Sequence, residues 1–189
     1  METLLNEDER RLLLQIARRA LEASVCGQPL PPLDWDSLPD CFQELGATFV
    51  TLTRQGQLRG CIGALEAHLP LADDVCVHTQ AAALEDYRFL QVTLEELPDI
   101  VIEISRLTSP QPLAYEGPED LISKLHPGID GVVLRDGFRR ATFLPQVWEK
   151  IPAPDLFLSH LCQKMGVAPT AWHKKKLEVF TYQVEEFHE

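Results

Sequence analysis

Two kinds of apolar periodicity run along the chain and predict a mixture of helices and half-buried strands. Between Asn6 and Gly27, apolar residues recur at i, i+3 and i+4, which is the pattern of an amphipathic helix. Between Asp99 and Leu107 they alternate with polar residues, which is the period of a strand with one wet face. Strands outnumber helices and no regular strand-helix-strand alternation occurs. We therefore expect an α+β fold with a largely antiparallel sheet and packed helices.

Capping signals place the predicted helices. The first is expected to start at Asn6, whose side chain can cap it, with Glu9 in the capping-box position. A proline suited to the first turn, followed by acidic residues, predicts a second helix over residues 70–85. A third helix is predicted from Asp155, acting as its cap, to Met165.

Turn residues predict two hairpins. Gly56 lies between two β-rich runs, which we expect to pair as antiparallel neighbours. Asp136-Gly137 is the strongest short-range hairpin signal in the chain and predicts a two-residue turn between two further strands. The four runs, together with a final expected strand, cover residues 47–53, 58–65, 132–135, 138–144 and 178–184.

Composition and charge narrow the class of protein. The chain has 189 residues, 45% of them hydrophobic, which is enough to bury a core as one domain. Its 29 acidic and 17 basic residues give a net charge of −12, which argues against general binding to nucleic acid or to anionic membranes. No signal peptide is recognisable, and no stretch approaches about 18 uncharged apolar residues. We expect a soluble cytoplasmic protein.

Cysteine usage and the absence of familiar motifs exclude several chemistries. The five cysteines are an odd number and include no C-x-x-C pair, which fits neither a disulfide framework nor a thiolate zinc site. A reducing compartment is expected, and the sequence offers no convincing ligand set for a metal or a cofactor. P-loop, G-x-G-x-x-G and G-x-S-x-G motifs do not occur, so several nucleotide and hydrolase mechanisms lose their usual support.

The run 58–65 carries the strongest candidate for chemistry. Arg59 and Cys61 fall on one face of an extended chain, and Gly60 and Gly63 frame the cysteine. Glycine lets a backbone or a ligand approach closely, so the thiol can meet a substrate with backbone N–H groups nearby. The arginine is near enough to hold a carboxylate or phosphate and to favour the thiolate.

Packing alone also explains this run. Free cysteine is among the most buried residue types, and glycine in a strand is equally consistent with close packing of the sheet. His126 and Asp130 share a predicted turn and also have two interpretations. Their side chains can approach each other, or each can only form hydrogen bonds with the backbone of the turn. His160 and Lys164 lie four residues apart on one face of the third predicted helix.

The run Arg59-Gly60-Cys61-Ile62-Gly63 resembles the AMMECR domain family, known in bacteria and archaea as protein A of the AmmeMemoRadiSam system. The resemblance continues in register through nearly the whole chain and includes the run Ala141-Thr142-Phe143-Leu144-Pro145. The sequence departs from the family pattern at Tyr87, His126 and Gln146. The second departure argues against a catalytic His126.

The resemblance implies a single AMMECR domain over residues 1–189 with a two-lobed α+β fold, the N- and C-terminal segments lying in the larger lobe. It also implies association with a Memo-like protein and a radical S-adenosylmethionine enzyme, which would hold any metal or iron-sulfur cluster. It strengthens the functional interpretation of Arg59 and Cys61. It adds weaker candidates for the same cleft, which are Asp130, Thr142, His160 and Lys164.

Two functions from different classes stay open. In the first, the protein is an enzyme or an enzyme subunit in which Cys61 attacks or carries an electrophilic group, and His160 or Lys164 carries the proton. In the second, it is a non-catalytic scaffold or ligand-binding module, and the glycine-cysteine strand serves packing. In the first hypothesis, the residues expected to bind the substrate are Arg59, Gly60, Gly63, Asp130 and Thr142.

Overall fold

The structure is a computed structural model that describes residues 4–189, and the chain divides into two compact units. The first unit contains the chain up to Thr108 together with Glu185–Glu189, and the second unit is Ser109–Val184. Each unit has its own hydrophobic core. The two units are therefore described one at a time.

The sheet of the first unit is built around β1 (Leu45–Arg54). Strand β2 (Gln57–Gly63) lies on one side of it, and β4 (Ile100–Leu107) on the other, followed by β9 (Val184–His188). The short β3 (Leu69–Pro70) pairs with the start of β1. Strand β1 is antiparallel to β2, β3 and β4, so the predicted antiparallel sheet is confirmed.

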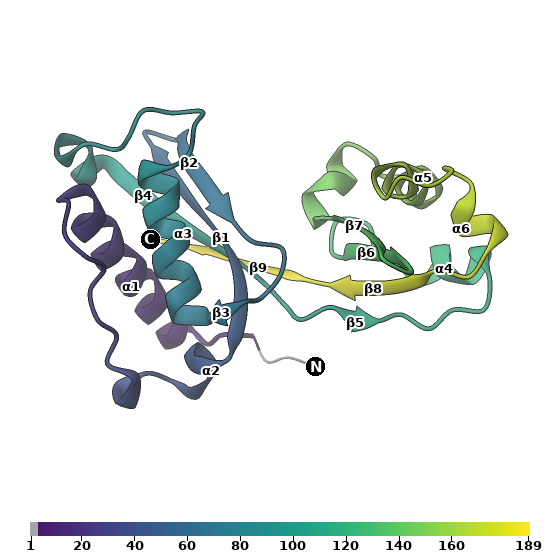
Figure 1. Ribbon diagram of the computed structural model, residues 1–189, viewed down its shortest axis with the longest axis horizontal. Helices are drawn as coiled ribbons and strands as arrows, with labels where there is room; N and C mark the ends of the chain where they lie inside the picture. Colours follow the sequence, from purple (N-terminus) through teal and green to yellow (C-terminus); the bar gives the residue numbers. More distant parts are fainter. Residues whose placement is uncertain (1–3) are drawn as a thin grey trace. The chain divides into compact units, whose positions relative to one another are not determined.

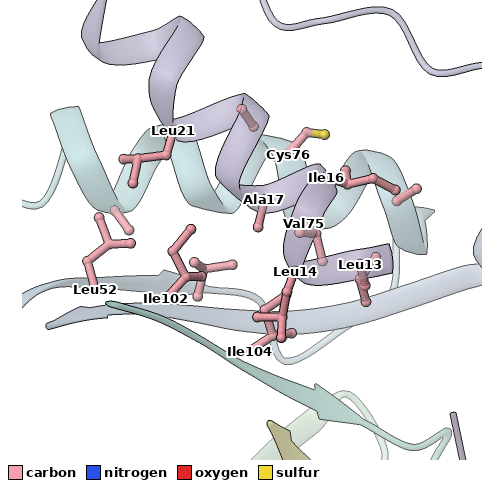
Figure 2. Close-up of a cluster of buried hydrophobic side chains, with 14 of the residues drawn as sticks. Leu13, Leu14, Ile16, Ala17, Leu21, Leu52, Val75, Cys76, Ile102 and Ile104 are labelled. Carbon is pink, nitrogen blue, oxygen red and sulfur yellow. The ribbon is translucent and has the colours of Figure 1, made fainter. Parts of the chain in front are cut away.

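Two helices, α1 (Glu7–Val25) and α3 (Leu71–Leu84), pack on one face of this sheet (Figure 1). The apolar stripe predicted for α1 is buried, because it meets α3 and the inward-pointing side chains of Leu52, Ile102 and Ile104 (Figure 2). The alternation that predicted β4 has the same cause, since every second residue of that strand points into this core. Both periodicities are thus confirmed. The unit also contains α2 (Asp40–Gln43), η1 (Trp35–Ser37) and η2 (Leu94–Asp99).

The predicted first hairpin is present and contains a β-bulge. Gln55 and Gly56 form its turn, both with positive φ (52° and 75°), as a type I′ turn requires. Within the hairpin, Leu52 of β1 pairs with Gly60, whereas the next residue of β1, Thr53, pairs with Leu58. Arg59 is therefore the extra residue of a bulge, which breaks the strict alternation of side chains along β2.

The second unit contains a four-stranded sheet in the order β5-β8-β6-β7, with antiparallel pairing throughout. Its helices pack on this sheet through large apolar side chains, including Trp148 and Phe157, whose rings stack with centroids 3.6 Å apart. The strands are β5 (Gln111–Pro112), β6 (Gly131–Asp136), β7 (Arg139–Phe143) and β8 (Glu178–Tyr182). The helices are α4 (Pro118–Lys124), η3 (Pro145–Glu149), α5 (Pro154–Lys164) and α6 (Ala171–Lys174).

Several boundaries differ from the sequence-based prediction by one or two residues, and three differences in the second half of the chain are informative. The second hairpin is present, but Asp136 pairs with Arg139, so its two-residue turn is Gly137-Phe138. Helix α5 starts one residue early because proline suits its first position, which leaves Asp155 inside the first turn rather than at the cap. The single strand expected over residues 178–184 is two strands, β8 and β9, which belong to different sheets.

Within residues 4–189, no helix is both long and apolar enough to cross a membrane.

The cap of α1 yields a stability prediction. The Asn6 side chain accepts hydrogen bonds from the backbone N–H groups of Asp8 and Glu9, each at 3.0 Å, and Glu9 accepts from the Asn6 N–H at 2.8 Å. We expect Asn6→Ala to lower the free energy of unfolding by about 1 kcal/mol in urea titrations. Asn6→Asp keeps the acceptor and is expected to retain wild-type stability; equal losses in both variants would contradict the capping role.

Candidate functional site

Cys61 lies in the middle of β2 with its side chain partly exposed. It pairs with Thr51 of β1, whose hydroxyl donates a hydrogen bond to Cys61 Sγ at 3.3 Å. Thr51 also pairs with Glu103 of β4, so three side chains form a row across three strands. Because neighbouring residues of a strand point to opposite faces, this row lies on the face opposite to the core of Leu52 and Ile102.

The backbone of Cys61 is bound from outside the sheet by two side chains. Strand β2 stands at one end of the strand order, so one of its edges has no strand neighbour within the described chain. There the Cys61 N–H donates to Asp86 Oδ2 at 2.9 Å, and Arg88 Nη2 donates to the Cys61 carbonyl at 3.2 Å. Asp86 and Arg88 therefore supply one acceptor and one donor where an adjacent strand would supply both.

Asp86 and Arg88 also form an ion pair with each other. Arg88 Nε donates to Asp86 Oδ1 at 2.9 Å and Nη2 to Oδ2 at 2.7 Å, and the Asp86 side chain is almost fully buried. The hydrogen bonds from Arg88 hold the pKa of the Asp86 carboxyl well below its usual range. The pKa of Arg88 is raised chiefly by its hydrogen bonds to Asp86, and the nearby Cys61 thiol adds to this effect. An ion pair is thus fixed beside Cys61.

Arg59 is held by a different segment. Its Nε and Nη2 donate to the Glu96 carboxylate at 2.8 and 3.0 Å, and its terminal nitrogens also donate to the carbonyls of Leu90 at 2.7 Å and Gln91 at 3.1 Å. These hydrogen bonds lower the pKa of Glu96 to about 2. The guanidinium therefore ties β2 to the segment that precedes η2. That Arg59 also holds a substrate anion stays a prediction.

The two glycines of the run are explained by packing. A Cβ on Gly60 would lie 2.1 Å from the carbonyl oxygen of Ala82 in α3. A Cβ on Gly63 would lie 2.3 Å from the Thr48 carbonyl oxygen and 2.5 Å from the Cα of Phe49. All three distances are to backbone atoms, which cannot move aside without displacing a helix or a strand. Whether either glycine also admits a substrate stays a prediction.

The other four cysteines differ in burial. Burial raises the pKa of the Cys41 thiol to about 11 and that of Cys76 to about 12, and it also raises the pKa of Cys162. Cys26 is exposed at the end of α1. These thiols give a graded set of references for the reactivity of Cys61.

In the second unit, Asp130 and His126 are in contact. The carboxylate of Asp130 accepts the backbone N–H of His126 at 2.8 Å and lies 3.0 Å from His126 Nδ1. The backbone carbonyl of Asp130 accepts a hydrogen bond from the indole of Trp148 at 2.7 Å. Asp130 is thus buried and stabilises its turn. Its carboxylate contacts both the side chain and the backbone of His126.

The second unit also brings together Thr142 and Lys164. Lys164 Nζ donates to the Thr142 carbonyl at 2.9 Å and lies 5.1 Å from the centre of the Phe143 ring. The Thr142 hydroxyl lies 3.0 Å from that of Tyr182, whose pKa is raised by burial. His160 is exposed one turn earlier on α5. That Lys164 or His160 acts with Cys61, which belongs to the first unit, stays a prediction.

Among the described residues, no group of three or more His, Cys, Asp and Glu side chains is arranged to hold a metal ion.

Spacing alone did not identify the side chains that hold Cys61. Asp86 and Arg88 lie 25 and 27 positions away along the chain, beyond α3, and Thr51 is on the partner strand. A carboxylate and a guanidinium two residues apart just after a helix were the available signal. That pair of residues points to Cys61 only in the folded chain, where α3 brings the segment after it back to the edge of β2.

The close contact between α3 and β2 yields a second prediction. Gly60→Ala is expected to lower the free energy of unfolding by about 2 kcal/mol or more, because the added Cβ meets helix backbone. Gly117→Ala is the matched control, since a Cβ there has open space, and its cost is expected to stay below about 1 kcal/mol. Urea titrations of both variants provide the measurement; equal costs would show that the packing at Gly60 is not limiting.

The ion pair of Arg59 and Glu96 yields a pH-dependent prediction. The pKa of Glu96 is about 2 in the folded protein against 4.5 in the absence of these contacts, so its stabilisation is present above about pH 4.5 and is lost as the pH falls towards 2. We expect Glu96→Gln to cost about 1–2 kcal/mol at pH 7 and progressively less in acid. Urea titrations over this range test it, with exposed Glu95→Gln as control; a cost independent of pH would contradict the charge-based explanation.

Comparisons with known proteins identify the family. The AMMECR1 family model matches residues 14–187. A protein of Methanothermobacter thermautotrophicus is 40% identical over 98% of this chain and 96% of its own length, and one of Thermofilum pendens is 37% identical over 98% and 92%. The crystal structure of uncharacterized protein PH0010 from Pyrococcus horikoshii is similar with a TM-score of 0.76 and 31% identity, covering 98% of this chain and 93% of that one. The chain therefore belongs to the AMMECR1 family.

Proposed function

We propose that this AMMECR1-family protein is an enzyme subunit in which the Cys61 thiol forms a covalent bond to an electrophilic carbon of its substrate. The observation that carries the proposal is the way the residue is held. Its N–H and carbonyl are bound by Asp86 and Arg88, and its partly exposed sulfur accepts a hydrogen bond from Thr51 at 3.3 Å. The two backbone contacts fix the position of the residue, and the hydrogen bond from Thr51 acts on the sulfur itself.

The chemistry required of Cys61 is simple. The thiolate is the nucleophile, so the thiol first passes its proton to solvent, and a sulfur electron pair then adds to the carbon of a carbonyl-type group. The π electrons of that group move to its oxygen, which takes up a proton in turn. The Thr51 hydroxyl is placed to donate to the sulfur while it carries negative charge.

Arg88 is the better candidate for holding an anionic group of the substrate. The donors of Arg59 are bound to Glu96 and to two carbonyls. In Arg88, Nε and Nη2 are bound, whereas Nη1 has no hydrogen-bond partner among the described residues, and the side chain is 46% exposed. A carboxylate or phosphate bound at Nη1 would lie on the residue that already contacts Cys61.

The partners in this proposal follow from the resemblance. The AmmeMemoRadiSam system supplies a Memo-like protein and a radical S-adenosylmethionine enzyme, and these would hold the metal or cluster that the reaction needs.

A specific observation also favours the second function, a docking module. The segment after α3 exposes Tyr87 to 94% and Leu90 to 89%, although Asp86, Arg59 and Glu96 hold the backbone around them in place. Exposed tyrosine and leucine on a fixed backbone are typical of protein-protein contacts. In this alternative, the polar contacts to β2 serve to present these two side chains.

The rate of alkylation of each native cysteine by iodoacetamide, read by peptide mass spectrometry, tests the first function. At pH 7, the raised pKa values of Cys41 and Cys76 lower their thiolate fractions about 100-fold and about 1000-fold below that of an ordinary thiol. We expect Cys61 to react at least about tenfold faster than exposed Cys26. Protection of Cys61 until the protein unfolds would contradict the nucleophile role and favour the docking module.

Two variants separate reactivity from folding. Thr51→Val keeps the shape of the side chain and removes the hydroxyl, so it is expected to slow the alkylation of Cys61 without changing that of Cys26. Cys61→Ser is expected to abolish turnover when the protein is reconstituted with a Memo-like protein and a radical S-adenosylmethionine enzyme. Full turnover by Cys61→Ser would show that the thiol is not the nucleophile.

A further inference from the structure

The first unit contains a basic groove that plays no part in the proposed chemistry of Cys61. It lies between α1 and the end of β9 and has a volume of about 560 Å³. The lining carries four arginines and His188 against two carboxylates, Glu7 and Glu189, so it has a net positive charge in a chain whose net charge is −12. The side chains that matter for the argument are Arg10, Arg11, Arg18 and Arg19, with the apolar Leu14 and Phe187 between them.

Two of the four arginines are already held by the fold. Arg10 donates two hydrogen bonds to the buried carboxylate of Glu185, at 2.9 and 2.7 Å, and lies over the Phe187 ring. Arg18 is paired with Glu189 and donates to two backbone carbonyls, at 3.3 and 2.7 Å. These two side chains are fixed parts of the groove wall.

The other two arginines are available to a ligand. Arg11 pairs with Asp8 at 3.2 Å, but the two side chains are 67% and 91% exposed, so water screens the pair and a ligand can replace it. Arg19 is exposed and makes no hydrogen bond or ion pair with any described residue. The groove therefore presents two mobile positive charges on one fixed helix.

The spacing of these charges selects a kind of ligand. Arg11, Gln15 and Arg19 follow one another at i, i+4 and i+8 on the exposed side of α1. At about 1.5 Å per residue, the two arginines start about 12 Å apart along the helix axis. An extended peptide advances about 3.3 Å per residue with side chains on alternate faces, so residues four apart match this distance on one face.

We propose that this groove binds an extended acidic segment of a partner protein, with carboxylates four residues apart on Arg11 and Arg19. The residue midway between them lies on the same face of the peptide and meets the Gln15 amide. A short peptide fits better than nucleic acid or an anionic membrane, because their charge extends beyond the groove and meets the acidic remainder of the protein.

The test is fluorescence anisotropy with a labelled nonapeptide that carries glutamates at its third and seventh positions, leucines beside them and a central glutamine. The full chain is expected to bind it, and Arg11→Gln with Arg19→Gln is expected to weaken binding about tenfold, the size of two exposed charge contacts. Lys150→Gln with Lys174→Gln removes the same charge from exposed positions of the second unit and is expected to leave binding unchanged.

Further binding measurements distinguish an acidic peptide from a neutral peptide and from a nucleic acid. Replacing both peptide glutamates by glutamine, or raising the salt from about 50 to about 300 mM, is expected to weaken binding, since the contacts are exposed charges. Equal binding of the two peptides, or equal loss in the two double variants, would overturn the proposal. Tighter binding of a single-stranded oligothymidylate than of the acidic peptide would overturn it as well.

Discussion

Two side chains take the place of a missing strand at the edge of β2, and the surroundings of Cys61 depend on this arrangement. A backbone N–H and a carbonyl that are shielded from water need partners, and Asp86 and Arg88 provide them. The same segment is fastened a second time, where Arg59 reaches Glu96 and two carbonyls. Between these two attachments the chain has little freedom. The position of the thiol is therefore set by residues that follow α3 as much as by its own strand.

Local patterns were sufficient for the longer helices and strands of the first unit. The helix at residues 7–25, the strand at 100–107 and the turn at Gln55-Gly56 each carry their own signal, because each buries one face or needs a particular backbone conformation. The division of the last strand into β8 and β9 carries no such signal. Both halves read as β-rich sequence, and only the identity of the neighbouring strand, a non-local property, separates them.

The candidate site was predictable in the same partial way. The sequence led to Cys61 and to the glycines beside it, since a thiol framed by glycine in a strand is uncommon. It paired the thiol with Arg59 by assuming strict alternation, and a bulge at that residue breaks the alternation. A bulge depends on how two strands match, so one strand's sequence does not show it. The same holds for Gly60, whose close neighbour is the backbone of α3.

The division of the chain into units has a consequence for folding order. The second unit is inserted between residues of the first, whose sheet needs β9 beside β4. Glu185 accepts hydrogen bonds from the Leu5 N–H and from Arg10 and Arg106. The two guanidinium groups therefore lack this carboxylate until Glu185 has been synthesised. During synthesis, α1, α3 and the four strands β1 to β4 emerge before the second unit, and their sheet is completed only when β9 is made. The first unit is therefore begun before the second unit is made and completed only after it.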